Sequence, residues 1–96
     1  MILHTLNASP GSAAFSDCLR IITAGDALLL MGDGVYAVIA NSDAATALQA
    51  SGAELYVLAA DAKAAAVNNF VEGVTRVDMG GFVALSERFP RQQAWY

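Results

Sequence analysis

The residue with the clearest potential for chemistry is Cys18, the only cysteine and so the only sulfur nucleophile of the chain. A reactive cysteine needs a lowered pKa, which a helix N-terminus or an adjacent cation supplies. Cys18 instead lies in the middle of a predicted helix, with only Arg20 nearby in sequence. Apolar residues recur around it at helical spacing, which predicts a buried stripe. These are Phe15, Leu19 and Ile22. We favour a packing role and keep Cys18 as the candidate catalytic residue.

A second candidate is the glycine-rich turn Gly32-Asp33-Gly34. Glycines before a helix can cradle a phosphate, because the first amides of the helix point at the ligand. The third glycine of a dinucleotide fingerprint is missing, as is the acidic residue after the next strand. A tight turn with Asp33 as a helix N-cap is the interpretation we favour. A nucleotide- or anion-binding module at these three residues remains the alternative.

His4 is the only histidine, so it cannot build a zinc site, which normally draws several His or Cys ligands. We expect a half-buried histidine that bonds to neighbouring backbone, and we expect neither a metal nor a cofactor.

The elements that position these residues alternate between strands and helices. Residues 27–31 are a short, continuous apolar run, which is typical of a strand buried on both faces. Gly25 is expected to end the preceding helix in the left-handed conformation. We predict the other strands at residues 1–6, 54–58, 74–78 and 92–96 and the helices at residues 13–23, 43–50, 62–70 and 82–89. Asp61 is expected to cap the third helix, Gly80-Gly81 to precede the fourth, and Pro90 to end it.

This spacing leaves a crossover between successive strands, as βαβ units require. The sequence therefore predicts an α/β fold, a single domain over residues 1–96 with three layers (α/β/α) and a five-stranded, mostly parallel sheet.

Composition limits the function. The chain has 96 residues, of which 56% are hydrophobic and 15% charged, and its net charge is −4. No apolar run is long enough for a membrane span, so we expect no membrane association and assign the apolar excess to a protein interface. No cluster of Lys and Arg could follow a phosphate backbone, so we expect no direct nucleic-acid binding. The single cysteine and the missing signal peptide favour the cytoplasm.

Several segments, taken together, resemble the TusB/DsrH family over the whole chain. They are residues 1–5, 9–10, 25–30 and 33–37, then 56–58 with Asp61, Asp78 with Phe82, Val83 and Leu85, and the tail 93–95. The resemblance implies a DsrE/F/H-like fold and a subunit of a sulfur-relay complex, assembled with TusC-like and TusD-like sisters as a hetero-hexamer. One branch of the family serves 2-thiolation of the tRNA wobble uridine, and the other serves dissimilatory sulfur oxidation.

The resemblance also bears on the sulfur chemistry. It implies that a TusD-like sister carries the persulfide cysteine after a strand, at the place of Leu58, Ala59 or Ala60 here, none of which can carry sulfur. An Arg-Gly pair associated with the third crossover is replaced by Ala64-Ala65-Ala66. We therefore expect a non-catalytic structural subunit of a sulfurtransferase complex in the tRNA branch, not an enzyme on its own.

Two further expectations concern alternatives and partners. Some DsrH-like proteins have a cysteine in the first helix, so a DsrH-like subunit with Cys18 as an accessory sulfur acceptor is the other family alternative. Trp95 and Tyr96 end the chain, and we expect them to contribute to an interface, because large aromatics are commonly enriched in interface cores. Self-association of the isolated chain is kept as an alternative to assembly with its sisters, and the sequence does not decide between a monomer and an oligomer.

Overall fold

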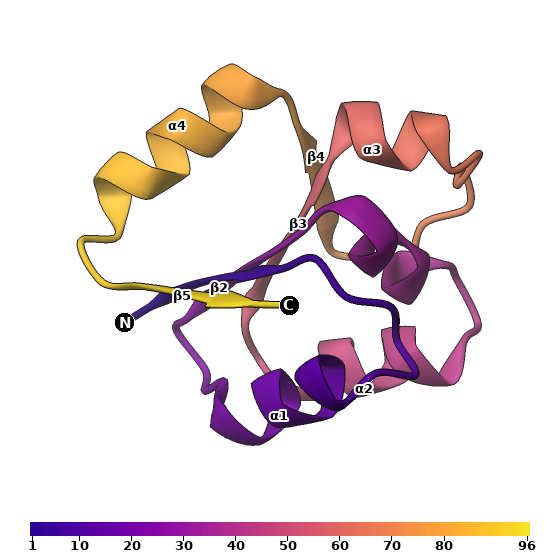
Figure 1. The fold of residues 1–96 in the computed structure, drawn as a ribbon, viewed down its shortest axis with the longest axis horizontal. Helices are drawn as coiled ribbons and strands as arrows, with labels where there is room; N and C mark the ends of the chain where they lie inside the picture. The colour runs from indigo at the N-terminus through magenta and orange to yellow at the C-terminus, as the bar shows by residue number, and fades with distance from the viewer.

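A computed structural model describes residues 1–96, and a single five-stranded sheet in the order β4-β3-β2-β1-β5 runs through it (Figure 1). All four strand pairs are parallel. The elements are β1 (Leu3–Leu6), α1 (Ala13–Ile21), β2 (Ala27–Leu30), the 3₁₀ helix η1 (Gly32–Val38), α2 (Asp43–Ala50), β3 (Glu54–Leu58), α3 (Ala59–Ala64), β4 (Val74–Val77), α4 (Met79–Arg88) and β5 (Gln92–Trp95). The predicted α/β class and five strands are confirmed.

Strand β2 lies at the centre of the sheet, and all four of its residues are fully buried. Leu28 pairs with His4 of β1 and with Leu55 of β3. A strand without polar positions is stable only where both faces are covered, as the apolar run predicted.

The helices cover the two faces of the sheet unequally. One core cluster joins Leu28 and Leu30 to side chains of α1, η1, α2 and α3. On the other face Leu3 and Leu29 pack in a smaller cluster with Leu85 of α4 and with Phe89, which follows this helix. Figure 1 shows α4 on the opposite side of the sheet from α1 and α2. The connection through α4 runs from the edge strand β4 to the other edge strand, β5, so one helix must span this face.

Side-chain caps fix three helix starts. The hydroxyl of Ser12 accepts a hydrogen bond from the Phe15 amide, and Ser42 does the same for Ala45. The carboxylate of Asp78 accepts from the Gly81 amide at 2.8 Å. Each cap satisfies an amide that the first helical turn leaves without a partner.

The start of α4 corrects the prediction that Gly80-Gly81 precedes this helix. Both glycines lie inside α4, which begins at Met79. A Cβ atom at position 81 would lie 2.9 Å from Cβ of Val77, so glycine lets the helix start directly beside the end of β4. Close packing against Val77, not a position before the helix, accounts for Gly81.

The end of α1 also differs from the prediction. The helix stops at Ile21 and not at residue 23, because the carboxylate of Asp26 accepts hydrogen bonds from the amide and hydroxyl of Thr23. Gly25 is left-handed as predicted (φ +93°), but it lies in the turn that leads into β2 and does not end the helix.

Neither predicted aspartate cap forms. Met31 occupies the N-cap position of η1 without a side-chain bond, and Asp33 lies in its first turn. Helix α3 begins at Ala59 and ends at Ala64, so it starts earlier and is shorter than the predicted 62–70. Asp61 lies in its first turn and instead accepts from the Gly32 amide at 2.8 Å. A tertiary contact has replaced the local cap.

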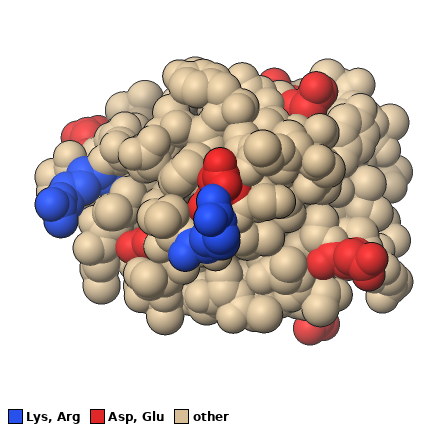
Figure 2. Space-filling model, turned by 60° about the horizontal axis from the view of Figure 1, so that its bottom comes forward, with Lys and Arg blue, Asp and Glu red and all other residues tan.

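The surface is sparsely charged. On the face drawn in Figure 2, charged side chains are few and scattered among large uncharged areas. Several large apolar side chains are exposed, namely Met1, Ile21, Tyr36, Met79, Val83 and Tyr96. None of the helices has the length and apolar character that a membrane crossing requires.

Candidate functional site

Cys18 lies on the side of α1 that faces the sheet and is fully buried there, in the same core cluster as Leu28 and Leu30. Burial, together with the negative charge of Asp26, raises the pKa of its thiol to about 11. The nearby cation Arg20 is paired with Asp17 at the surface and does not offset this. A thiol in this setting is almost entirely protonated at neutral pH and is a poor nucleophile.

His4 is also fully buried, and both ring nitrogens bond to side chains. Nε2 lies 3.0 Å from Oδ2 of Asp26, and Nδ1 accepts a hydrogen bond from the indole Nε1 of Trp95 at 3.1 Å. This corrects the expectation of a half-buried histidine bonded to backbone. The sheet brings the three residues together, because β1 lies between β2 and β5.

The indole fixes the tautomer of His4. An indole N–H can only donate, so Nδ1 must be the acceptor, and Nε2 then carries the proton that it donates to Asp26. The His4 and Trp95 rings stack with an interplanar angle of 23°. Because neither nitrogen is free, His4 cannot act as a general base for Cys18.

Asp26 is the acceptor at the centre of this network. Its carboxylate accepts from the amides of Ile2 and Thr23 as well as from His4. Burial opposes its ionised form, but the hydrogen bonds from His4, Thr23 and Ile2 outweigh that effect, and the pKa of Asp26 lies below its usual value. We call His4, Asp26 and Trp95 the buried triad; it links the beginning, the first crossover and the end of the chain.

The turn Gly32-Asp33-Gly34 is shaped by packing against the end of β1. A Cβ atom at Gly32 would come within 1.8 Å of Oδ1 of Asn7, and one at Gly34 within 2.4 Å of the Leu6 carbonyl oxygen. Gly32 is also left-handed (φ +53°). Gly34 is therefore required by the fold itself, because it meets fixed backbone, and Gly32 is favoured by its left-handed conformation.

This turn offers little to an anion. The Gly32 amide already donates to Asp61, and a shallow cavity of about 250 Å³ beside it is lined by both Asp33 and Asp61. An anion there would meet two carboxylates and would have to displace one of them from its amide.

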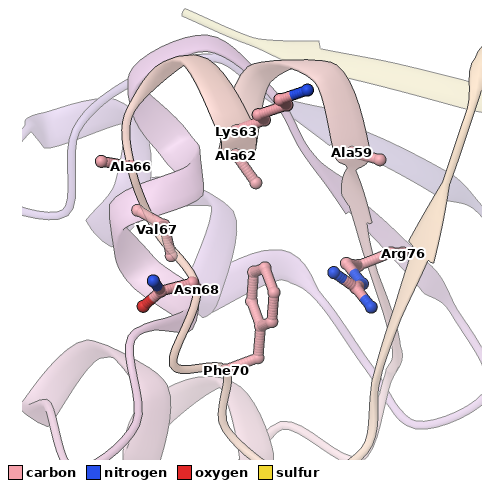
Figure 3. Close-up of a pocket in the computed structure, with 8 residues that line it drawn as sticks. All are labelled: Ala59, Ala62, Lys63, Ala66, Val67, Asn68, Phe70 and Arg76. Atoms are coloured by element: carbon pink, nitrogen blue, oxygen red, sulfur yellow. The ribbon is translucent and has the colours of Figure 1, made fainter.

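The carboxyl end of β3 carries no group that could hold sulfur. Leu58 is buried, and Ala59 and Ala60 form the first turn of α3. Beside Ala59 lies a cavity of about 370 Å³, lined by Ala59, Ala62, Lys63, Ala66, Val67, Asn68, Phe70 and Arg76 (Figure 3). This cavity has the size range of small-molecule sites.

The C-terminal residues form the predicted edge strand. β5 pairs with β1, with Trp95 opposite Leu6. The indole of Trp95 packs against the core, whereas Tyr96 is 86% exposed. The two residues proposed for an interface thus have different surroundings within this chain.

Sequence reasoning missed the buried triad and the cavity beside Ala59. A single histidine, an aspartate just before the buried strand and a terminal tryptophan were the available signals for the triad, but they lie far apart in the chain. Their contact depends on strand order, which local patterns do not encode. Lys63 and Arg76 come from different elements, and only the pairing of β3 with β4 brings them to one cavity.

These features define a class of protein: a small, all-parallel α/β domain whose only thiol is buried. The family model of the DsrH-like proteins matches residues 8–92. The chain belongs to this family, and membership supports a role as a subunit of a sulfur relay.

Relatives match the chain along its whole length. It is 40% identical to Protein TusB of Pectobacterium parmentieri, 39% to Protein TusB of Klebsiella pneumoniae strain 342 and 33% to Protein TusB of Escherichia coli strain K12 / DH10B. Each alignment covers 98% of this chain and 100% of the relative. The resemblance drawn from the sequence is confirmed.

The fold also matches the crystal structure of the YchN protein from E. coli, with a TM-score of 0.80 over 97% of both chains. Sequence identity is only 15%, so this likeness concerns the fold alone.

Proposed function

We propose that this chain is a non-catalytic structural subunit of a TusBCD-type sulfurtransferase complex, which relays persulfide sulfur toward 2-thiolation of the tRNA wobble uridine. Its partners in the proposal are TusC-like and TusD-like subunits in a cytoplasmic hetero-hexamer. The tRNA branch is favoured by full-length identity of 33–40% to proteins named TusB.

The observation that carries the non-catalytic role is the state of the only thiol. Cys18 has no exposed surface and a pKa of about 11. A persulfide carrier must present a thiolate to a donor and then to an acceptor, and a buried, protonated thiol does neither. The end of β3, where the resemblance places the sister's cysteine, has only leucine and alanine. Sulfur transfer is therefore assigned to a partner.

The exposed apolar side chains support an assembly role. Met79 and Val83 lie one turn apart on α4 and are 60% and 55% exposed. Large apolar side chains left in water by a small domain are typical of a surface that a partner covers.

Co-expression with TusC-like and TusD-like partners, followed by size exclusion, tests the proposal. We expect all three chains to elute together at a mass equal to two copies of each. The matched control is the YchN protein, which has the same fold at only 15% identity. It is expressed with the same two partners. Elution of this chain apart from both partners would contradict the proposal.

A further inference from the structure

The cavity beside Ala59 gathers unpaired positive charge in an acidic protein. Two of the five basic side chains, Lys63 and Arg76, line it, although the net charge of the chain is −4. Arg20 and Arg88 are each paired with a carboxylate, whereas Lys63 and Arg76 form no ion pair. No aspartate or glutamate lines the cavity. Cations without a partner in a concave site attract an anion.

The walls of the cavity are apolar, and they are held in place. Five of the eight lining residues are hydrophobic. The backbone of Phe70 is held in place by an isolated antiparallel β-bridge with Ile39. The amide of the next residue, Val71, donates a hydrogen bond to the Val38 carbonyl at 2.8 Å. Arg76 lies over the Phe70 ring, 5.5 Å from its centre, which orients the guanidinium. Figure 3 shows Arg76 turned toward Phe70, whereas the ammonium group of Lys63 is directed away from both of these side chains.

We propose that this cavity binds a small organic anion: a phosphate or carboxylate held by Arg76, with Lys63 as a second nearby positive charge, attached to a flat or apolar body that packs against Phe70 and the alanine wall. A planar guanidinium suits either oxyanion, because it can donate two parallel hydrogen bonds. The volume of about 370 Å³ accommodates such a molecule. This site differs from the Gly32-Asp33-Gly34 turn, where carboxylates face the opening. It is independent of the proposed function.

Titration of the ¹⁵N-labelled full-length chain, followed by amide chemical shifts, tests the proposal. Adenosine monophosphate and benzoate are the probes, and they distinguish a nucleotide from an aromatic carboxylate. Adenosine and inorganic phosphate are controls that supply the body and the anion separately. We expect saturable shifts at residues 66–70 and 74–77 with at least one probe, and weaker ones with either control.

Variants identify the groups responsible. Arg76→Gln should weaken binding about tenfold, because it removes a charged hydrogen bond to the anion, and Lys63→Gln should weaken binding less, because its ammonium group is directed away from Phe70. Arg91→Gln removes an exposed cation outside the cavity and should leave binding unchanged. Absence of saturable shifts with both probes up to about 10 mM would overturn the proposal. An equal loss of binding in all three variants would overturn it too, because it would indicate attraction to overall charge.

Discussion

At the scale of single residues, Cys18 is placed for packing. We expect its alkylation in the native protein at neutral pH to be far slower than in the unfolded chain, because a pKa of about 11 leaves roughly one thiol in ten thousand ionised. The measurement compares the rate of iodoacetamide labelling in buffer and in denaturant.

The companion variant is Cys18→Ala. It should lower the free energy of unfolding by about 1 kcal/mol, since it removes a small buried group, and leave sulfur transfer by the assembled complex intact. Loss of transfer without loss of assembly would favour the alternative in which Cys18 is an accessory sulfur acceptor.

The buried triad makes stability depend on pH through Asp26. Its pKa is lower in the folded chain than in the unfolded one, so its contribution is complete above the unfolded pKa of about 3.9 and is lost as pH falls through the lower, folded pKa. We therefore expect the free energy of unfolding, measured by urea titration, to fall below about pH 4. Asp26→Asn should lower the free energy of unfolding by at least about 2 kcal/mol at pH 7 and make it depend less on pH below about pH 4.

The control for this prediction is Asp17→Asn, which removes an exposed carboxylate and should change little. Equal slopes below pH 4 for the original chain and Asp26→Asn would show that other carboxylates dominate its acid sensitivity.

At the scale of elements, the loop after α3 contains an unfavourable backbone conformation. Ala66 has φ +58°, which costs an L-residue about 1–2 kcal/mol, and glycine adopts it freely. In the family that the sequence resembles, an Arg-Gly pair is associated with this crossover, and Ala64-Ala65-Ala66 replace it here. Ala66→Gly should raise the free energy of unfolding by about 0.5 kcal/mol, as relief of strain exceeds the entropy that glycine adds to the unfolded chain.

The matched control is Ala64→Gly, two residues earlier and helical, which should lower stability by up to about 1 kcal/mol. Both are measured by thermal and urea unfolding. The same sign of change for both variants would contradict the strain at Ala66.

The edge strand β5 is expected to hold the two ends of the chain together. Deletion of residues 92–96 removes the pairing with β1 and leaves Nδ1 of His4 without its donor. The loss of the Trp95 side chain alone should lower the free energy of unfolding by about 3 kcal/mol, so the deletion should lower the melting temperature markedly. Deletion of Tyr96 alone, which is exposed, serves as the control and should have little effect on it. An unchanged melting temperature and unchanged assembly after the longer deletion would refute this role.

At the scale of the whole molecule, the exposed apolar side chains predict self-association when the chain is isolated. Burial of apolar surface is favourable by roughly 25 cal/mol per Å², so copies without partners should associate through these side chains. Light scattering over a range of concentrations should give an average mass that rises with concentration and falls when TusC-like and TusD-like partners are added. A constant monomer mass would instead indicate that the apolar surface is tolerated in water.

The sequence by itself determined the class of fold and most of the elements. The apolar run of β2 and the limits of α2 and β3 follow from local patterns, because they depend on neighbours along the chain. The family resemblance also came from sequence, and so did the absence of a nucleophile after β3. The prediction that Cys18 is buried was correct, since the helical stripe already assigns its face.

Only the tertiary structure decided how residues far apart in the chain share their polar groups. Asp61 caps no helix because its carboxylate reaches the Gly32 amide across the sheet edge, and Asp26 ends α1 while it also accepts from His4. The triad and the cationic cavity depend on the strand order β4-β3-β2-β1-β5. That order results from packing over the whole chain, because a buried donor or acceptor takes the best partner in space, whatever its distance in sequence.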